Sequence, residues 1–213
     1  YIRVSTEMQC YASQEYEIRR FCRSHLIVID EWVSESISGT IEIERRVLGK
    51  TIENMEKGDL LTTVKQVWRF RDSILEEYIT RYNENDFIDY RYRVNWNEKH
   101  KMLKVAFPVN AYANEAYHET QFGYVKYPVH RSYQTDADRY EVCNHRYTAL
   151  TDGAHGAAVL NNGKYGVNVV ENEIRLTLLK SAMMPDQTAD RGYQIVTYAF
   201  YPFDGAFQDS DVP

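Results

Sequence analysis

The stretch Tyr90-Arg91-Tyr92-Arg93-Val94-Asn95-Trp96 decides the fold of the larger part of this chain. Its even-numbered positions carry aromatic or aliphatic side chains, and its odd-numbered positions carry arginine or asparagine. An alternation of period two is typical of an antiparallel strand with one buried face. After a charged turn the alternation returns in Leu103, Val105, Phe107 and Val109.

More strand signals follow in the second half of the chain. Asn161-Asn162-Gly163-Lys164 separates the apolar run 157–160 from the strand-like run 165–170, and this spacing predicts a hairpin turn. We expect further strands over 173–179 and 195–201. Many strands, many tyrosines and few helix signals indicate an antiparallel β-sandwich over residues 62–213.

The residues before Leu61 show a different pattern of hydrophobic residues. A short β-rich run at 1–5 and an Ile/Val-rich run at 26–33 predict two strands, and a stripe of apolar residues at 11–22 predicts a helix between them. Leu48, Ile52 and Met55 predict a second helix, which ends at Lys57 and Gly58. Leu60 and Leu61 would open a third strand.

The predicted fold class is therefore mixed. Residues 1–61 form a short, truncated α/β unit with a parallel sheet, and residues 62–213 form an all-β antiparallel sandwich. A fused gene and a misjoined sequence would both produce such a junction, and the sequence leaves both origins open. The truncated unit would leave an unpaired sheet edge.

Composition excludes several classes of protein. The 213 residues carry a formal net charge of -6, which disfavours bulk attraction to nucleic acid or to an anionic membrane. The three cysteines, Cys10, Cys22 and Cys143, lie far apart and read as reduced thiols. There is no apolar run near 18 residues, so we expect no contact with a membrane and a cytoplasmic, bacterial location.

The run Tyr1-Ile2-Arg3-Val4-Ser5-Thr6, with Ile37-Ser38-Gly39 and Lys57-Gly58-Asp59, resembles the catalytic domain of the serine recombinases, the resolvase and DNA invertase family. The resemblance implies that Ser5 is the position of the DNA-attacking nucleophile and that Arg3 binds phosphate. Either Arg45 or Arg46 would be a second phosphate ligand. DNA would be the partner under this alternative, although the second arginine cluster and the DNA-binding domain of the family are missing.

The second half resembles the carboxy-terminal β-domain of the family 38 α-mannosidases. The matching segments are Trp68 to Ser73, Val94-Asn95-Trp96, Lys99 to Pro108, Gln121-Phe122-Gly123, Cys143 with His145, and Lys164-Tyr165-Gly166. In that family a zinc ion and a nucleophilic aspartate belong to an amino-terminal domain that these residues do not include. The resemblance thus implies no zinc or other cofactor in this chain.

The second half of the sequence gives little support for any particular catalytic or metal-binding residue. The five histidines there form no local cluster with metal-ligand spacing, and each favours a structural or surface role. The carboxylate pairs Glu76-Glu77 and Asp136 with Asp138 favour solvated positions, because glycosidase carboxylates must face each other across a sugar. Aromatic side chains could line a sugar-binding face, but their alternation favours core packing.

The sequence predicts a fragment of an α-mannosidase β-sandwich that is inactive alone and is fused to a partial recombinase. Its partner would be a mannosidase catalytic domain or a mannose-containing glycan. Two alternatives remain open: DNA strand exchange through Ser5, and non-catalytic binding of mannose glycans.

Overall fold

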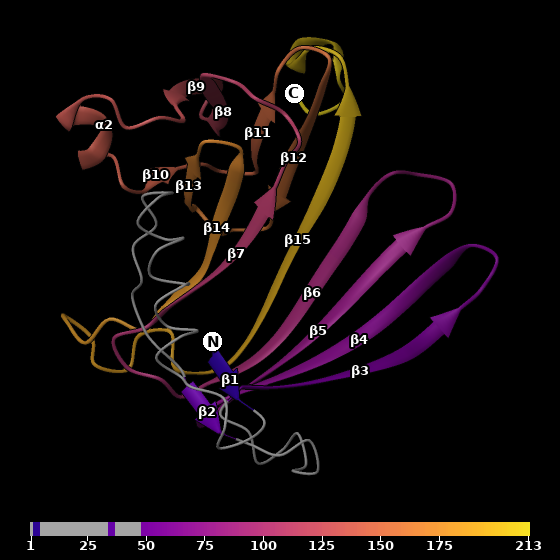
Figure 1. The fold of residues 1–213 in the computed structure, drawn as a ribbon, viewed down its shortest axis with the longest axis vertical. Coiled ribbons are helices and arrows are strands. Elements are labelled where there is room, and N and C mark those ends of the chain that lie inside the picture. The colour runs from indigo at the N-terminus through magenta and orange to yellow at the C-terminus, as the bar shows by residue number, and fades with distance from the viewer. Residues whose placement is uncertain (1, 5–33, 37–47) are drawn as a thin grey trace.

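The computed structural model describes residues 2–4, 34–36 and 48–213, with side chains from residue 58 onward. Most strands belong to one antiparallel sheet of nine, in the order β3-β4-β5-β6-β15-β12-β11-β8-β9 (Figure 1). Its strands are β3 (Leu48–Lys57), β4 (Leu61–Phe70), β5 (Ser73–Tyr82), β6 (Ile88–Trp96), β8 (Glu115–Thr120), β9 (Gly123–Pro128), β11 (Tyr147–Thr151), β12 (His155–Asn161) and β15 (Gly192–Asp204).

A second antiparallel sheet of four strands has the order β10-β13-β14-β7. It contains β7 (Met102–Pro108), β10 (Val142–Cys143), β13 (Gly166–Val170) and β14 (Glu173–Lys180). In Figure 1 strands β3 to β6 fan away on one side of β15, while β7 and β14 lie on the other side. The short helix α2 (Gln134–Asp138) joins β9 to β10, and the 3-10 helix η2 (Phe207–Asp209) follows β15.

The core between the two sheets is built by the predicted alternation. Tyr92, Val94 and Trp96 on β6 are buried, whereas the alternate residues Arg91 and Asn95 are exposed and Arg93 is half-buried. Across the core, β14 contributes apolar side chains that pack in the same cluster, namely Ile174, Leu176, Leu178 and Leu179. The antiparallel sandwich predicted for the second half is confirmed.

The other face of the large sheet has a smaller core. Tyr147, Ala149 and Ala158 pack there against the end of the chain, where Phe207 is fully buried. The Phe207 ring stacks on that of Tyr117, with 4.3 Å between the ring centroids. The segment after β15 therefore covers part of the second face, although the sequence shows no strand pattern there.

The predicted helix ending at Lys57 is wrong, because residues 48–57 form strand β3. It pairs antiparallel with β4, from Leu48 opposite Phe70 to Lys57 opposite Thr62. The register shifts between Asn54 and Glu56, so a bulge interrupts the strand near its end. An irregular strand of this kind does not show clean period-two spacing, and here its three apolar positions matched helical spacing instead.

The predicted hairpin at 161–164 is also wrong. β12 belongs to the nine-stranded sheet and β13 to the four-stranded sheet, so this turn connects the two layers. The Asn161 side chain shapes it by accepting a hydrogen bond from the Lys164 backbone N–H over 2.7 Å. Gly163 adopts a φ of 85°, a conformation that favours glycine. Turn residues were correctly recognised, but they do not specify which strands pair.

Strands β1 (Ile2–Val4) and β2 (Ser34–Ser36) pair in parallel. β1 coincides with the first predicted strand, and Arg3 lies in it, opposite Glu35. Residues 11–22 and 26–33, like Ser5, Arg45 and Arg46, lie outside the described residues. The α/β unit is thus described only as one parallel pair.

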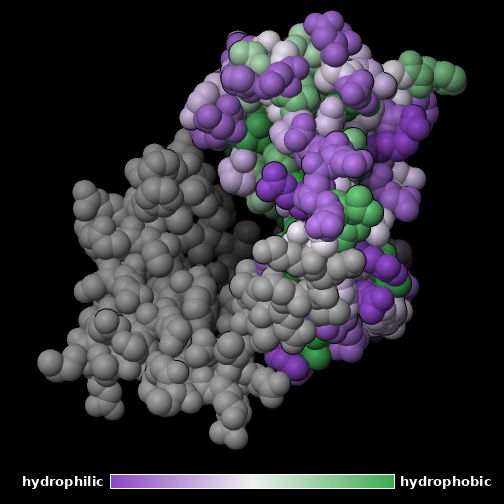
Figure 2. Space-filling model, turned by 90° about the vertical axis from the view of Figure 1, so that its right-hand side faces the viewer, coloured by the Kyte–Doolittle hydropathy of each residue, from purple (hydrophilic) through white to green (hydrophobic). Residues whose placement is uncertain are grey.

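The surface on the side shown in Figure 2 is mixed. Hydrophilic residues predominate, and hydrophobic residues appear among them in separate spots. No helix in the described part of the chain is both long and apolar enough to cross a membrane.

Candidate functional site

A groove of about 820 Å³ lies between the large sheet and strand β7. Its floor is formed by aromatic and aliphatic side chains of three adjacent strands, β4, β5 and β6: Trp68, Phe70, Leu75, Tyr92 and Trp96. The opposite wall is the segment from His100 to Val105, and Tyr140 lies at the rim. The groove forms where the four-stranded sheet ends and the large sheet continues beneath it.

A buried carboxylate holds two of the floor rings. Glu77 on β5 is 6% exposed and accepts hydrogen bonds from Trp68 Nε1 at 3.2 Å and from the Tyr92 hydroxyl at 2.6 Å. The strand register explains this arrangement. Glu77 lies directly opposite Tyr92 on β6, and on β4 it lies opposite Gln66, so that Trp68, two positions further along β4, is on the same face of the sheet. Burial raises the pKa of Tyr92, and the neighbouring Glu77 carboxylate raises it further, so the phenol stays protonated and donates.

The third large ring of the floor is held from the opposite side of the groove. Trp96 Nε1 donates to the Ser181 hydroxyl at 3.1 Å, and Ser181 lies just after β14. Trp96 also stacks on Phe70, with 6.4 Å between the ring centroids. The polar atoms of Trp68, Tyr92 and Trp96 are therefore all engaged within the protein.

The wall opposite the floor carries two lysines, Lys101 and Lys104, and the charge of Lys104 is neutralised by an ion pair. Lys104 on β7 forms an ion pair with Glu141. Burial lowers the pKa of Lys104, and the Glu141 carboxylate opposes this shift. Glu141 also accepts a hydrogen bond from the Thr177 hydroxyl at 2.9 Å, so the pair bridges β7, β14 and the residues before β10.

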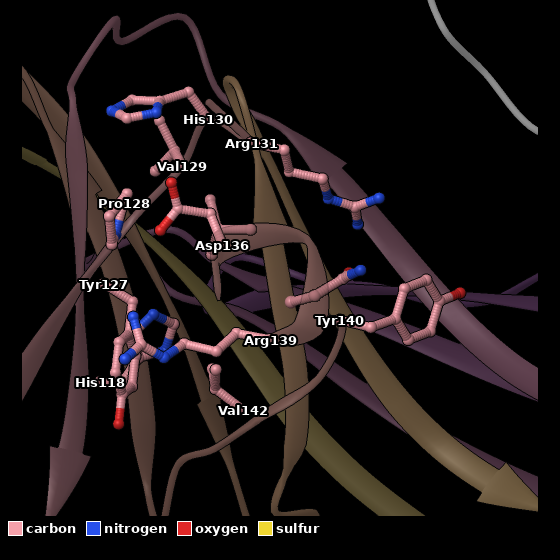
Figure 3. A pocket seen from close by; sticks show the side chains of 12 residues that line it. His118, Tyr127, Pro128, Val129, His130, Arg131, Asp136, Arg139, Tyr140 and Val142 are labelled. Atoms are coloured by element: carbon pink, nitrogen blue, oxygen red, sulfur yellow. The ribbon is translucent and has the colours of Figure 1, made fainter. Parts of the chain in front are cut away.

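A second hollow lies beneath helix α2 and is much smaller, with a volume of about 20 Å³ (Figure 3). Tyr127, His118 and Arg139 lie together at one end of it, and the Arg139 guanidinium stands 5.4 Å from the centre of the Tyr127 ring. Arg131 extends toward Tyr140 instead, 5.5 Å from the centre of that ring. This volume has room for about one water molecule, so the hollow does not admit a sugar.

His118 at the base of this hollow is 1% exposed, and its Nδ1 lies 3.1 Å from the Thr148 hydroxyl. Burial lowers its pKa to about 4, so the ring is neutral at pH 7. Neutral imidazole is a good metal ligand, but metal binding also needs further ligands close by.

The described residues do not fit a zinc ion. The histidines are spread over the sandwich, each with a different neighbour: His130 with Ser132, His145 with Tyr165, and His155 with Asp204. Among the described side chains, no three of histidine, cysteine, aspartate or glutamate come together in a way that could hold a metal. Residues 58–213 thus offer no centre through which a zinc-dependent step could run.

The carboxylate pairs singled out in the sequence have separate roles. Glu76 and Glu77 point to opposite faces of β5, and Glu76 pairs with Lys65 at 3.1 Å while Glu77 is buried. The expectation that both are solvated is wrong for Glu77. Asp136 and Asp138 lie in α2, where Asp136 accepts a hydrogen bond from the Tyr133 backbone N–H at 3.2 Å.

Comparison with known proteins gives the family. The model of the "Glycosyl hydrolases family 38 C-terminal domain" matches residues 3–188, well over half of the chain. The chain belongs to this family. The family 38 resemblance predicted for residues 62–213 is confirmed.

Relatives of this family 38 C-terminal domain include three α-mannosidases. Alpha-mannosidase 2C1 of Mus musculus is 41% identical over 126 residues, which is 59% of this chain and 12% of that protein. Alpha-mannosidase of Saccharomyces cerevisiae is 41% identical over 118 residues, or 55% of this chain and 11% of the yeast protein. Alpha-mannosidase G of Dictyostelium discoideum is 34% identical over 189 residues, or 86% of this chain and 17% of that protein.

The fold agrees with the family. An α-mannosidase from Enterococcus faecalis V583 superimposes with a TM-score of 0.67 at 13% identity, covering 74% of this chain and 22% of the bacterial enzyme. A second family 38 protein from Enterococcus faecalis gives a TM-score of 0.65 at 12% identity, with 76% and 23% of the two chains covered. The present chain therefore spans less than a quarter of each of these proteins.

These matches bear on the predicted junction at residue 61. The family model begins at residue 3 and runs across the junction, and the 86% coverage by the Dictyostelium protein exceeds what residues 62–213 alone supply. The comparisons give no support for a serine recombinase segment.

Proposed function

We propose that this chain is the β-sandwich part of an α-mannosidase and that the catalytic residues belong to other parts of the polypeptide. The family match over residues 3–188 carries this proposal. The relatives support it, because the chain corresponds to 11% to 17% of their lengths. The partner of the sandwich is then the catalytic domain of the same enzyme, whose cleft it helps to shape.

The purified chain is expected to be inactive as a glycosidase. We expect no release of the aryl group from p-nitrophenyl α-mannoside above a buffer control, with or without added zinc. Release that disappears with a chelator would overturn this part of the proposal. A full-length family 38 α-mannosidase under the same conditions serves as the positive control.

A second candidate function is non-catalytic binding of mannose-containing glycans. The aromatic groove favours it, because four aromatic rings form the floor of a space of about 820 Å³. Titration of the chain with mannose oligosaccharides in a calorimeter tests this candidate. An absence of heat at millimolar sugar would remove it without affecting the family assignment.

The recombinase alternative stays a prediction, because Ser5, Arg45 and Arg46 lie outside the described residues. Covalent trapping of DNA on the wild-type chain, but not on Ser5→Ala, would support DNA strand exchange through this serine. Equal behaviour of the two proteins would remove it. The fusion of two genes at residue 61 likewise stays a prediction.

A further inference from the structure

We propose that a depression on the outer face of the large sheet binds one hexopyranose ring of a neutral glycan through Asp89 and Arg91. The outer face is the one turned away from the core between the two sheets, and the side chains of Thr80, Asp89, Arg91 and Ala199 belong to it. The proposal rests on the glycan-binding candidate above and gives it a site apart from the aromatic groove.

Short side chains on neighbouring strands create this depression. On β5 Thr80 lies opposite Asp89 of β6, and on β15 Ala199 lies opposite Asp89 from the other side. Larger side chains line the same space, namely Tyr78, Tyr82 and Leu160. The depression has a volume of about 430 Å³, and binding sites for small molecules enclose roughly 300 to 1,000 Å³. It therefore has room for a sugar ring.

Two opposite charges of the depression come from the same strand. Asp89 and Arg91 are two residues apart on β6, so their side chains project from the same face of the sheet. Among the residues that the structure describes, no ion pair joins the two, and no other carboxylate pairs with Arg91. Arg91 is also exposed to solvent. Its guanidinium N–H groups are therefore available to a ligand.

The carboxylate of Asp89 is oriented before any ligand arrives. The Tyr82 hydroxyl donates a hydrogen bond to Asp89 Oδ2 over 2.9 Å. This hydrogen bond and the charge of the carboxylate raise the pKa of Tyr82, so the phenol stays protonated and donates. Asp89 Oδ1 has no partner among the described residues and can accept from a ligand hydroxyl. A carboxylate fixed in this way loses little conformational entropy on binding.

The rim toward β12 adds two neutral polar groups. Asn162 and Thr197 both line the depression. The backbone N–H of Asn162 donates to the Thr197 carbonyl over 3.3 Å, which ties the turn after β12 to β15. The Asn162 side chain is exposed, and neither its amide nor the Thr197 hydroxyl is hydrogen-bonded to another described residue. Both groups can donate as well as accept.

This set of groups favours a neutral polyhydroxylated ligand. Two neighbouring hydroxyls of a sugar can donate to Asp89 and accept from Arg91 at the same time, and hydrogen bonds to charged groups are the stronger ones. An anion would be repelled by Asp89, and a cation would be repelled by Arg91. Arg93, the next arginine on this face, lies over the Tyr78 ring instead, 5.1 Å from its centre.

The test uses the full chain, with methyl α-D-mannopyranoside and an α-linked mannotriose as probes and with affinity measured by calorimetry. Arg91→Ala is expected to weaken binding by about tenfold or more, because it removes the charged donor. Arg91 is exposed, so the variant should fold like the wild type. Arg81→Ala is the matched control, since Arg81 is an exposed arginine of β5 that makes the same change in net charge and does not line the depression.

A second pair of variants tests the space itself. Thr197→Trp fills the depression while Asp89 and Arg91 stay in place, and it is expected to weaken binding by about tenfold or more. Ile195→Trp is its control, because Ile195 is 51% exposed two residues earlier on the same strand and lies outside the depression. Inorganic phosphate serves as the anionic probe, and the wild-type chain is expected not to bind it.

Each outcome decides one point. Weakened binding of the mannosides in Arg91→Ala and Thr197→Trp, with wild-type binding in both controls, supports the site. Wild-type affinity in Arg91→Ala and Thr197→Trp overturns the site but leaves glycan binding elsewhere on the chain intact. Binding of phosphate without binding of the mannosides overturns the neutral ligand class. An absence of mannoside binding by the wild-type chain overturns both the site and the glycan-binding candidate, and the family 38 assignment is unchanged.

Discussion

At the scale of single residues, burial gives His118 a measurable pH dependence. Its pKa is lowered to about 4 by burial in the folded chain, against an ordinary value of 6.5. Below pH 6.5 the unfolded chain therefore takes up a proton that the folded chain does not. The free energy of unfolding should fall as the pH drops from 6.5 to 4, by on the order of 3 kcal/mol from this residue, and then level off.

Urea unfolding of the wild type and of His118→Asn at pH 7 and pH 4.5 measures this contribution. Asparagine keeps a polar atom within reach of Thr148 and does not titrate. We expect the wild type to be the more stable protein at pH 7 and its advantage to shrink at pH 4.5. His130→Asn is the control, because His130 is exposed. An advantage of the same size at both pH values would contradict the prediction.

At the scale of elements, Gly156 permits the close packing of β12 between β11 and β15. A Cβ atom at this position would lie 2.7 Å from the Leu150 carbonyl oxygen and 2.7 Å from Cζ of Phe203. Because the carbonyl belongs to a central strand, it cannot move away without disturbing the pairing of that strand. Gly156→Ala should therefore destabilise the fold by about 1 to 3 kcal/mol. Thermal unfolding measures the loss. Gly58→Ala is the matched control, since its nearest neighbour would be 3.8 Å away, and its stability should match the wild type.

The same scale shows why some elements were predictable and others were not. β6 was predictable because its alternation is regular and its burial follows the alternation. β3 was not, because its bulge breaks the period and its strand conformation depends on pairing with β4, which local sequence does not encode. The groove is a mixed case. The alternation of Tyr92 and Trp96 was visible, whereas the burial of Glu77 depends on the register of β4, β5 and β6 together.

At the scale of the whole molecule, strands on the two sides of the junction predicted at residue 61 pair with each other. β3 precedes the junction and pairs with β4, from Leu48 opposite Phe70 to Lys57 opposite Thr62. If β3 is removed, β4 becomes an edge strand of ten residues with an unpaired row of backbone groups. The stable unit is therefore expected to begin at β3 rather than at residue 62.

Three truncated chains decide where this unit begins: residues 48–213, 58–213 and 62–213. We expect the first to unfold at a higher urea concentration than the other two, because it alone keeps the β3–β4 ladder. The second is the matched control, since it lacks β3 but keeps β4 intact, and it should resemble 62–213. If 62–213 were as stable as 48–213, β3 would contribute nothing to the free energy of unfolding. The domain boundary predicted at residue 61 would then be supported. If 48–213 is the more stable chain, the sandwich includes residues on both sides of that boundary, as the family match over residues 3–188 indicates.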